Sequence, residues 1–361
     1  MDTLISNPRK LLIVQKAGLG DFLMLMPTLL TIHSNKPLLK LDLLVPEEIY
    51  ELAMRFNIFN SIRLFENNRK SMFKRIKSLL REIIINIIAP YDILFQPCSG
   101  PNLASYVLFT FSRAKLKIGF CYNKSFNVFD VTLNYSYEQK DVTQNTILLK
   151  YLGIDKEIIY PLMPIEFSEA LSADKIIQQQ KELIFDTITG GEKIIGIYPT
   201  TLLANDENSR HWGVNTFASF IDGLYGWEKN ILFIFFGSAQ DKYYCEQILN
   251  KTSIHFNAFI LAGRVNLFES CAVAKHCNLV IGIDGGFMHC VNLMKIESIV
   301  IWKSTSYKNH GYDNNYTINL SLGDGSGAAS SIKQKSTDHS SDAQVAELLK
   351  LTKNVLSGST Y

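Results

Sequence analysis

Short apolar segments alternate with amphipathic segments in the first third of the chain, and this alternation limits the folds that the chain can adopt. The apolar segments predict strands over Leu11–Gln15, Lys40–Val45, Ser61–Phe65, Tyr91–Gln96 and Leu116–Phe120. The amphipathic segments predict helices over Asp21–His33, Pro46–Phe56, Arg69–Ile88 and Asn102–Ser112. Strands that are apolar on both faces and alternate with helices indicate a parallel sheet covered on both sides.

A second alternation follows a polar, helix-prone stretch, Glu169–Thr187. It predicts strands over Lys193–Pro199, Ile231–Gly237, Phe259–Ala262, Leu279–Ile283 and Ser298–Trp302. It predicts helices over Asn215–Leu224, Asp241–Asn250, Leu267–His276 and Phe287–Met294. Two such series predict an α/β protein with two doubly wound, Rossmann-like domains that face a central cleft. The length of 361 residues suits this organisation, at roughly 100–200 residues per domain.

The predicted boundaries place an N-terminal domain at 1–168 and a C-terminal domain at 169–320. Residues 321–341 are rich in Gly and Ser and are predicted to form a flexible loop. Residues 342–361 are predicted to hold a last amphipathic helix, which Asp342 can cap. Its apolar side chains, including Val345 and Leu348, need a surface to bury against.

Charge and composition exclude several classes of protein. Lys and Arg number 36 and Asp and Glu 34, so the chain lacks the basic excess typical of nucleic-acid-binding domains. With 47% hydrophobic residues it is too apolar to be disordered, and no apolar segment approaches the roughly 20 residues that span a bilayer. The N-terminus does not have the pattern of a signal peptide. Six cysteines form no Cys-x-x-Cys pair, so we expect a reduced, cytoplasmic protein.

The first motif, Lys16–Asp21, directly follows the first predicted strand. Gly18 and Gly20 allow a tight turn close to a ligand at the carboxyl edge of the sheet. The dinucleotide fingerprint requires a third glycine where this chain has Leu23, which disfavours a nicotinamide site. Asp21 lies at a helix start, where it can cap the helix or act on a substrate. Both interpretations remain open at this point.

The second motif follows the strand Lys193–Pro199 and contains Thr200, Thr201 and, after a loop, Arg210. Two hydroxyls and a planar, permanently charged guanidinium suit a diphosphate. The alternative is an ordinary turn in which Trp212 anchors the core.

In the third motif the predicted strand Leu279–Ile283 leads into Asp284, Gly285 and Gly286, and a helix begins at once. Backbone N–H groups at such a helix start bind anions without any side chain. Asp284 is well placed to accept hydrogen bonds from sugar hydroxyls. His289 can act on a ligand, although a histidine here more often closes a hydrogen bond in the core.

These motifs, in this order and at about these distances, resemble the heptosyltransferase family of bacterial glycosyltransferases. The similarity covers most of residues 10–305 and rests on Gly18-Leu19-Gly20-Asp21 with Pro27, Tyr91–Gln96, Arg113–Phe120, Arg210-His211-Trp212 with Phe217, and Asp284–His289. The resemblance implies a GT-B fold, with the acceptor on the first domain and a nucleotide-sugar donor on the second. It also implies an inverting transfer of heptose from ADP-heptose to a lipopolysaccharide acceptor.

Carried over by position, the resemblance gives roles to single residues. Asp21 is implied to be the general base that takes the proton of the acceptor hydroxyl. The implied donor-binding residues are Thr200, Thr201, Arg210, Asp241, Asp284, Gly285, Gly286 and His289. Among them, Asp241 matches a carboxylate that holds the ribose. On the acceptor side we expect Gly20, Gln96 and Lys124.

The chain also departs from the family pattern. Gly285 stands where the family usually has Ser or Thr, and Arg210 replaces a more usual lysine. The loop Leu202–Ser209 is longer than in the best-known members and carries two acidic residues. The chain has no Asp-x-Asp sequence, a common metal–diphosphate ligand set in other glycosyltransferases, so we expect transfer without a metal or other cofactor.

The predicted helix Arg69–Ile88 is unusually basic. Its cations are Arg69, Lys70, Lys74, Arg75, Lys77 and Arg81, with apolar residues between them. One interpretation is a face that docks on anionic lipid at the inner side of the cytoplasmic membrane. The other is a solvated helix packed by its apolar stripe.

The sequence therefore predicts an inverting, metal-independent glycosyltransferase that moves heptose to a lipopolysaccharide-core or other surface-glycan acceptor. A transferase of the same fold with another donor is an alternative, and so is a binding subunit that has lost turnover. From the resemblance, we expect the final helix to pack back on the first domain.

Overall fold

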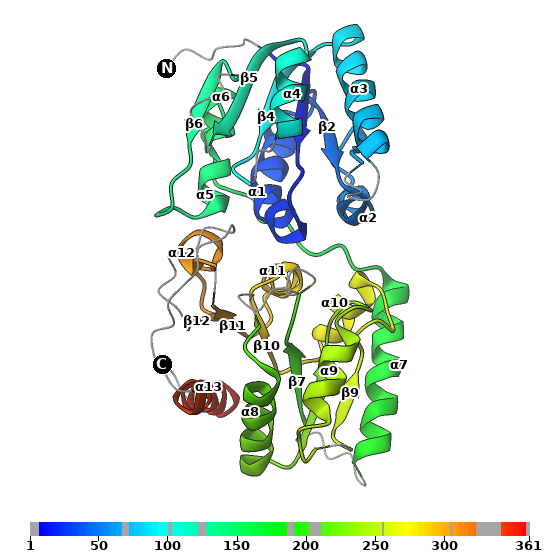
Figure 1. Ribbon diagram of the computed structural model, residues 1–361, viewed down its shortest axis with the longest axis vertical. Coiled ribbons are helices and arrows are strands. Elements are labelled where there is room, and N and C mark those ends of the chain that lie inside the picture. Colours follow the sequence, from blue (N-terminus) through cyan, green and yellow to red (C-terminus); the bar gives the residue numbers. More distant parts are fainter. Residues whose placement is uncertain are drawn as a thin grey trace. The chain divides into compact units, whose positions relative to one another are not determined.

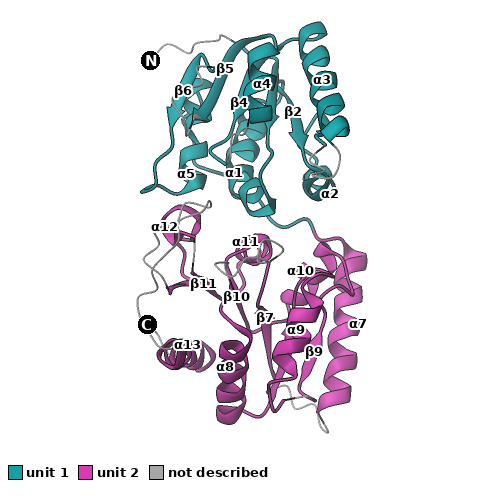
Figure 2. Ribbon diagram, in the orientation of Figure 1, with its two compact units in different colours: residues 1–164 teal, residues 165–361 magenta. Residues whose placement is uncertain are grey.

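The computed structural model describes residues 7–66, 72–99, 103–121, 128–185, 191–201, 211–254, 256–303, 305–322 and 341–358. The chain divides into two compact units, Met1–Pro164 and Ile165–Tyr361 (Figure 2). The sequence prediction places this division at 168. Residues 323–340, which contain most of the predicted flexible loop, lie outside the described residues.

Unit 1 is built on a six-stranded parallel sheet with the strand order β3-β2-β1-β4-β5-β6 (Figure 1). The strands are β1 (Lys10–Val14), β2 (Lys40–Val45), β3 (Ser61–Leu64), β4 (Tyr91–Gln96), β5 (Ala114–Cys121) and β6 (Val131–Asn134). The helices are α1 (Leu19–Asn35), α2 (Glu47–Arg55), α3 (Met72–Ile88), α4 (Leu103–Phe111), α5 (Asp141–Asn145) and α6 (Ile147–Tyr151). Helix α1 contacts α2, α5 and α6, whereas α3 contacts α4. The strand order reverses between β1 and β4, and ligands bind at the carboxyl ends of strands at such points.

Unit 2 has the same architecture, with the order β12-β11-β10-β7-β8-β9 and parallel pairing throughout. Its strands are β7 (Lys193–Tyr198), β8 (Ile231–Phe235), β9 (Ala258–Ile260), β10 (Leu279–Ile283), β11 (Ser298–Trp302) and β12 (Thr317–Ser321). Its helices are α7 (Phe167–Ile184), α8 (Val214–Trp227), α9 (Lys242–Leu249), α10 (Leu267–Ala274), α11 (Gly286–Leu293), α12 (Tyr307–His310) and α13 (Ser341–Leu356). The corresponding reversal lies between β7 and β10.

The central strands carry the strongest sequence signal because both of their faces are buried. Strands β8, β10 and β11 are buried along their whole length, and β1 is buried after its first residue. Two strands were missed in the sequence prediction, β6 and β12, and each forms an edge of its sheet. The side chains of β6 are only partly buried, so its sequence lacks the continuous apolar run of an interior strand.

The structure corrects the expectation for the C-terminal helix. Helix α13 packs against α8 and belongs to unit 2, whereas the sequence prediction placed it on the first domain. The α8 surface accepts it because Gly223 leaves room for Leu349: a Cβ at residue 223 would lie 2.8 Å from Leu349 Cδ1. The Trp212 indole donates a hydrogen bond to Gln344 Oε1 of α13 at 2.9 Å. The apolar stripe predicted from the sequence therefore finds its partner within its own unit.

Among the described helices, none is long and apolar enough to cross a membrane. The five cysteines whose side chains are described are buried free thiols.

Candidate functional site

Polar side chains in unit 1 gather where β1 and β4 end. The Asp21 carboxylate lies in the first turn of α1, where its Oδ2 accepts a hydrogen bond from the Gly18 N–H at 3.1 Å. Asp21 also lies near Cys98, which follows β4. The pKa of the Cys98 thiol is raised, mainly by burial and then by the negative charges of Asp141 and Asp21. The capping role predicted for Asp21 is therefore present. It uses one carboxylate oxygen and holds the side chain, which is partly exposed, at the edge of the sheet.

Two of the three acceptor candidates lie in the described part of the chain, and they differ in burial. Gln96 ends β4 and is fully buried, and among the described residues its Oε1 has no hydrogen-bond partner. Gly20 lies in the first turn of α1 and is partly exposed. Lys124 lies outside the described residues.

Sequence reasoning gave no role to three polar residues at this edge. Gln15 and Lys16 directly follow β1, and Ser99 follows β4. The Ser99 hydroxyl donates to Gln15 Oε1 at 3.1 Å, which links the ends of the two strands. The signal available in the sequence was their position, because polar residues that follow a fully apolar strand lie at the sheet edge where ligands bind.

In unit 2, Thr200 follows β7 and is buried. Its Oγ1 lies 3.0 Å from His211 Nδ1, and the His211 ring stacks on Tyr244 with 4.7 Å between centroids. Lys303, after β11, donates to the His211 carbonyl oxygen at 2.8 Å. Arg210, the predicted diphosphate ligand, lies outside the described residues together with the loop before it. The predicted core role of Trp212 is confirmed, since its side chain is buried and its ring centroid lies 5.0 Å from that of Phe217.

Asp284 follows β10 and is buried beside His289 of α11. The Thr305 hydroxyl donates to Asp284 Oδ2 at 2.6 Å, and His289 Nε2 lies 3.8 Å from Asp284 Oδ1. The His289 ring meets Tyr312 edge-on at 5.3 Å. The three motif residues Asp284, Gly286 and His289 thus lie together at the start of α11, and Thr305 is a partner that the sequence motif did not indicate.

Gly285 has a steric reason to be glycine. A Cβ at residue 285 would lie 2.5 Å from Thr201 Cγ2 and 3.0 Å from Tyr198 Cε1. The end of β7 therefore fills the space that a serine or threonine side chain would need. Thr201 lies against the start of α11, and its Oγ1 is buried without a hydrogen-bond partner among the described residues.

Asp241 lies at the carboxyl end of β8, next to β7 in the sheet. Its Oδ2 accepts hydrogen bonds from the Ser238 N–H and hydroxyl, both at 2.7 Å. This turn needs glycine at residue 237, where φ is +156° and a Cβ would lie 2.7 Å from the Asp241 Cβ. Within the described part of the chain, no three His, Cys, Asp or Glu side chains form a group that could hold a metal ion.

Comparisons with known proteins agree with this arrangement. A family model of glycosyltransferase family 9 (heptosyltransferase) matches residues 91–339. Among curated proteins, none matches this chain.

Solved structures match over nearly the whole chain at low sequence identity. A family 9 glycosyltransferase from Veillonella parvula is 16% identical with a TM-score of 0.76. The match covers 97% of this chain and 98% of the Veillonella chain. The E. coli ADP-heptose lipopolysaccharide heptosyltransferase II is 15% identical with a TM-score of 0.69, over 97% and 100% of the two chains. The E. coli heptosyltransferase WaaC with ADP is 14% identical with a TM-score of 0.64, over 94% and 99%.

The predicted fold class is thereby confirmed as GT-B-like, with two parallel six-stranded sheets. The family model covers more than half of the chain and includes the β10–α11 junction with Asp284. The chain belongs to glycosyltransferase family 9, the heptosyltransferase family.

Proposed function

We propose that this protein is an inverting, metal-independent transferase that moves heptose from ADP-heptose to a lipopolysaccharide-core or other surface-glycan acceptor. The observation that carries the proposal is the β10–α11 junction, where Asp284, His289 and Thr305 meet at a helix start. Structures of WaaC with ADP and with ADP-2-deoxy-2-fluoro heptose support an adenine-nucleotide donor for the family.

The proposed donor site lies in unit 2. Backbone N–H groups at the start of α11 suit a phosphate, because they point at the ligand and the helix dipole favours negative charge. Thr200, Thr201 and Arg210 are assigned to the diphosphate, and Asp241 to the ribose. Asp284 is assigned to the sugar hydroxyls, with Gly285 as the close contact between β7 and α11. Charge on the departing diphosphate is stabilised by the helix start and the Arg210 guanidinium.

The proposed acceptor site lies in unit 1, with Asp21 as general base. The acceptor hydroxyl loses its proton to the Asp21 carboxylate as it attacks the anomeric carbon, and ADP leaves with the bonding electron pair. The hydrogen bond from Gly18 fixes the carboxylate in place. Gly20, Gln96 and Lys124 are the proposed acceptor contacts.

Transfer assays with Asp21→Asn test this assignment. Asparagine keeps a side-chain oxygen that can accept from the Gly18 N–H, so the fold of the variant is preserved. We expect turnover to fall by roughly 10²- to 10⁴-fold, as for loss of a general base, with nearly unchanged thermal stabilisation by ADP. Turnover close to that of the wild type contradicts the base assignment.

Activity of the wild type that persists in EDTA supports metal independence, and loss of activity in EDTA contradicts it.

Two alternatives follow from Gly285 and the long acidic loop before Arg210. A transferase with another donor is favoured if UDP, GDP or CMP stabilises the protein and ADP does not. A binding subunit without turnover is favoured if ADP-heptose binds and is neither hydrolysed nor transferred.

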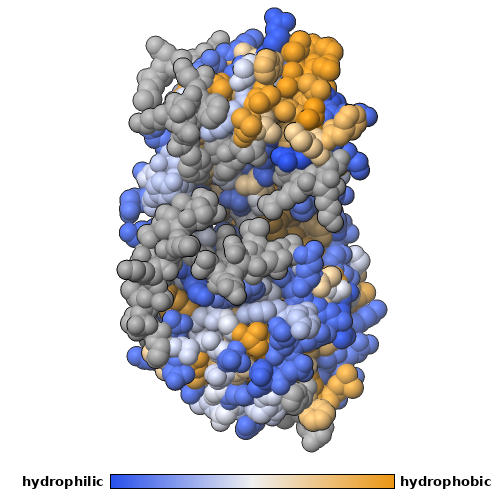
Figure 3. Space-filling view, in the orientation of Figure 1, coloured by the Kyte–Doolittle hydropathy of each residue, from blue (hydrophilic) through white to orange (hydrophobic). Residues whose placement is uncertain are grey.

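The proposal includes contact of α3 with an anionic membrane, because this helix exposes most of its apolar side chains. Ser78, Glu82 and Asn86 are buried, and Glu82 pairs with Arg63 at 2.8 Å. The exposed face is apolar and comprises Met72, Phe73, Ile76, Leu80, Ile84, Ile87 and Ile88. Figure 3 shows a continuous orange patch over this helix. Ile83 is buried in the core cluster of unit 1 and Leu79 packs against that cluster, so part of the apolar surface packs the helix onto its unit while the rest is exposed.

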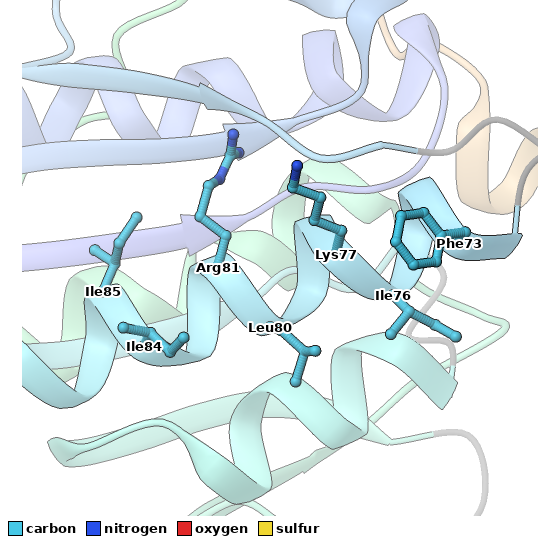
Figure 4. Close-up of a pocket in the computed structure, with 7 residues that line it drawn as sticks. All are labelled: Phe73, Ile76, Lys77, Leu80, Arg81, Ile84 and Ile85. Carbon is cyan, nitrogen blue, oxygen red and sulfur yellow. The ribbon is translucent and has the colours of Figure 1, made fainter.

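Cations border this apolar face. Lys74, Arg75, Lys77 and Arg81 are exposed on α3, while Arg69 and Lys70 lie outside the described residues. A shallow pocket runs along the helix, lined by Phe73, Ile76, Lys77, Leu80, Arg81, Ile84 and Ile85. Figure 4 shows Lys77 and Arg81 pointing away from Ile76, Leu80 and Ile84. An apolar face with adjacent cations suits the boundary between headgroups and acyl chains of an anionic bilayer.

Vesicle flotation tests the membrane contact. We expect binding to vesicles with about one third phosphatidylglycerol and little binding to pure phosphatidylcholine, since each cation near an anionic surface contributes about 1 kcal/mol. Phe73→Ser should weaken binding. Phe167→Ser, which removes an equally exposed phenylalanine from α7 of unit 2, should not. Equal binding to both lipid compositions, or equal effects of the two variants, contradicts the proposal.

A further inference from the structure

Lys303 is a cation at the carboxyl edge of the unit 2 sheet to which the sequence motifs gave no role. It directly follows β11, and its Nζ donates to the His211 carbonyl oxygen at 2.8 Å. An ammonium group carries several N–H donors, and in the described part of the chain this carbonyl is the one acceptor of Lys303. None of the ion pairs between described residues includes Lys303. Its side chain is exposed, so N–H donors and a positive charge are available to a ligand.

The side chain of Lys303 crosses the end of β10. In the strand order β12-β11-β10-β7, β10 separates β11 from β7. Lys303 starts at the end of β11 and reaches His211, whose ring Nδ1 lies 3.0 Å from Thr200 Oγ1 at the end of β7. The carboxyl end of β10 lies between these two points, and there Asp284 leads into α11. Lys303 therefore belongs to the same part of the sheet edge as the proposed donor residues.

The chain on both sides of Lys303 is held in place. Before it, the Ile301 carbonyl oxygen accepts from the Asp284 N–H at 3.1 Å. After it, the Thr305 hydroxyl donates to Asp284 Oδ2 at 2.6 Å. The ammonium group is thus positioned before a ligand arrives, and partial removal of water from it lowers the pKa of Lys303. A charge that is already positioned stabilises an anion without the cost of reorganisation.

Two carboxylates at this edge make a cation necessary for binding a diphosphate. Asp284 and Asp241 are both buried there, and each would repel the phosphate oxygens. Thr201 contributes a buried hydroxyl without a hydrogen-bond partner among the described residues, and a phosphate oxygen can accept from it. A ligand with several negative charges therefore fits this edge only if positive charge offsets the two acids.

The transfer reaction increases this requirement. The bond between the anomeric carbon and the phosphate oxygen breaks, and its electron pair stays on the diphosphate. The acceptor oxygen forms the new bond to carbon, and its proton passes to Asp21 in the proposed mechanism. The diphosphate gains negative charge in this step, and an adjacent ammonium group stabilises that charge.

We propose that Lys303 contacts the diphosphate of the nucleotide-sugar donor and stabilises it as the leaving group. This inference rests on the proposed donor site of unit 2 and adds a binding residue from the segment after β11. Because Lys303 acts on phosphate and not on the base or the sugar, its role is the same for any nucleoside diphosphate donor.

Thermal unfolding with ADP, inorganic pyrophosphate and adenosine tests the contact without any transfer reaction. We expect Lys303→Met to weaken binding of ADP and pyrophosphate by about 10- to 100-fold, as for loss of a hydrogen bond between charged groups. Adenosine has no phosphate and should stabilise both proteins equally. Lys303→Arg should retain much of the affinity. Lys251→Met should bind like the wild type, because this exposed lysine lies between α9 and the start of β9, at the amino edge of the sheet.

Lys303→Gln separates a contact with phosphate from a role in holding His211. Glutamine can still donate to the His211 carbonyl oxygen but carries no charge. We expect it to bind pyrophosphate as weakly as Lys303→Met does. Wild-type affinity of Lys303→Gln would mean that Lys303 only holds the chain at His211, and this overturns the proposal. Equal affinities of wild type and Lys303→Met for pyrophosphate overturn it as well.

Failure of the donor site as a whole gives a different result. If ADP, UDP, GDP and pyrophosphate all leave the Tm of the wild type unchanged, the proposed donor site is wrong and the role of Lys303 is wrong with it. If any of them stabilises the wild type and Lys303→Met equally, the donor site stands and only the role of Lys303 is overturned.

Acetylation of the wild type keeps the inference testable if the Lys303 variants do not fold. Lys303 is exposed and its pKa is lowered by partial burial, so it should react readily with acetic anhydride at neutral pH. Saturating ADP or pyrophosphate should slow its acetylation at least several-fold and leave Lys251 unaffected, as measured by peptide mass spectrometry. Adenosine should protect neither lysine. Equal acetylation of Lys303 with and without pyrophosphate contradicts the contact.

Discussion

Thr201 occupies the space that any side chain at residue 285 would need. A Cβ added to Gly285 would lie 2.5 Å from Thr201 Cγ2, closer than van der Waals contact permits. Gly285→Ser should therefore reduce the free energy of unfolding by about 1–3 kcal/mol, as overpacking does. The double variant Gly285→Ser/Thr201→Ala should recover most of this loss, because it removes the clashing methyl group. Urea unfolding of the two single variants and the double variant measures the coupling, and additive losses contradict it.

Thr305 is expected to hold Asp284 ready for a ligand. Thr305→Val removes the hydroxyl that donates to Asp284 Oδ2 and leaves this buried carboxylate oxygen without that partner. We expect a loss of about 1–3 kcal/mol in stability and weaker stabilisation by ADP-heptose. Thr305→Ser retains the hydroxyl and serves as the matched control in thermal unfolding. Indistinguishable results for the two variants would show that this hydrogen bond has no role.

Glu82 should be far more important for stability than an exposed carboxylate with a similar ion pair. Its side chain is fully buried and pairs with Arg63 at 2.8 Å. Glu82→Ala leaves Arg63 without this partner and should cost about 3–5 kcal/mol. Glu51→Ala breaks the exposed pair with Arg55, also short at 3.0 Å, and should cost less than about 1 kcal/mol. Chemical unfolding of both variants tests this, and equal losses contradict the buried role of Glu82.

Helix α13 should be required for the stability of unit 2. Leu348 is fully buried on this helix, so Leu348→Ala should cost about 2–5 kcal/mol. Lys350→Ala alters an exposed position of the same helix and should change stability by about 0.5 kcal/mol or less. The comparison is made by urea unfolding. A small effect of Leu348→Ala would mean that α13 is detached from α8 in solution.

Lys16 should make the stability of the protein depend on pH. Its pKa is lowered to about 7 in the folded state, whereas an unfolded lysine titrates near 10.4. Between these values the unfolded state binds more protons, so the free energy of unfolding rises with pH. The wild type should therefore gain a few kcal/mol relative to Lys16→Met between about pH 6.5 and pH 9.5. Unfolding free energies of both proteins at the two pH values check the sign, and a constant difference contradicts it.

The sequence was sufficient for the central sheets and insufficient for their edges. Strands such as β8 and β10 are apolar on both faces, and this pattern is visible without a structure. Strand β6 is half exposed and lies within a polar segment. Helix α13 was predicted correctly as a helix, but an apolar stripe does not say which surface will bury it. That surface depends on Gly223, a residue far away in the sequence.

The candidate site was predictable only where a residue lies in a local motif. Asp21 and Asp284 stand next to glycines at strand ends, and the structure finds them there. Thr305 is invisible in the sequence because it reaches Asp284 from the segment after a different strand, β11. Lys16 was noted only as part of a glycine loop, because burial and the absence of a partner are properties of the folded chain.

If the exposed apolar face of α3 binds a membrane as proposed, it determines how the enzyme encounters its acceptor. A protein held at a bilayer by this helix diffuses laterally in two dimensions, in the same plane as a lipid-anchored glycan. Its rate would then follow the surface density of the acceptor and not its bulk concentration. Dilution of the acceptor lipid within the membrane would slow the enzyme, whereas dilution of the whole suspension would not.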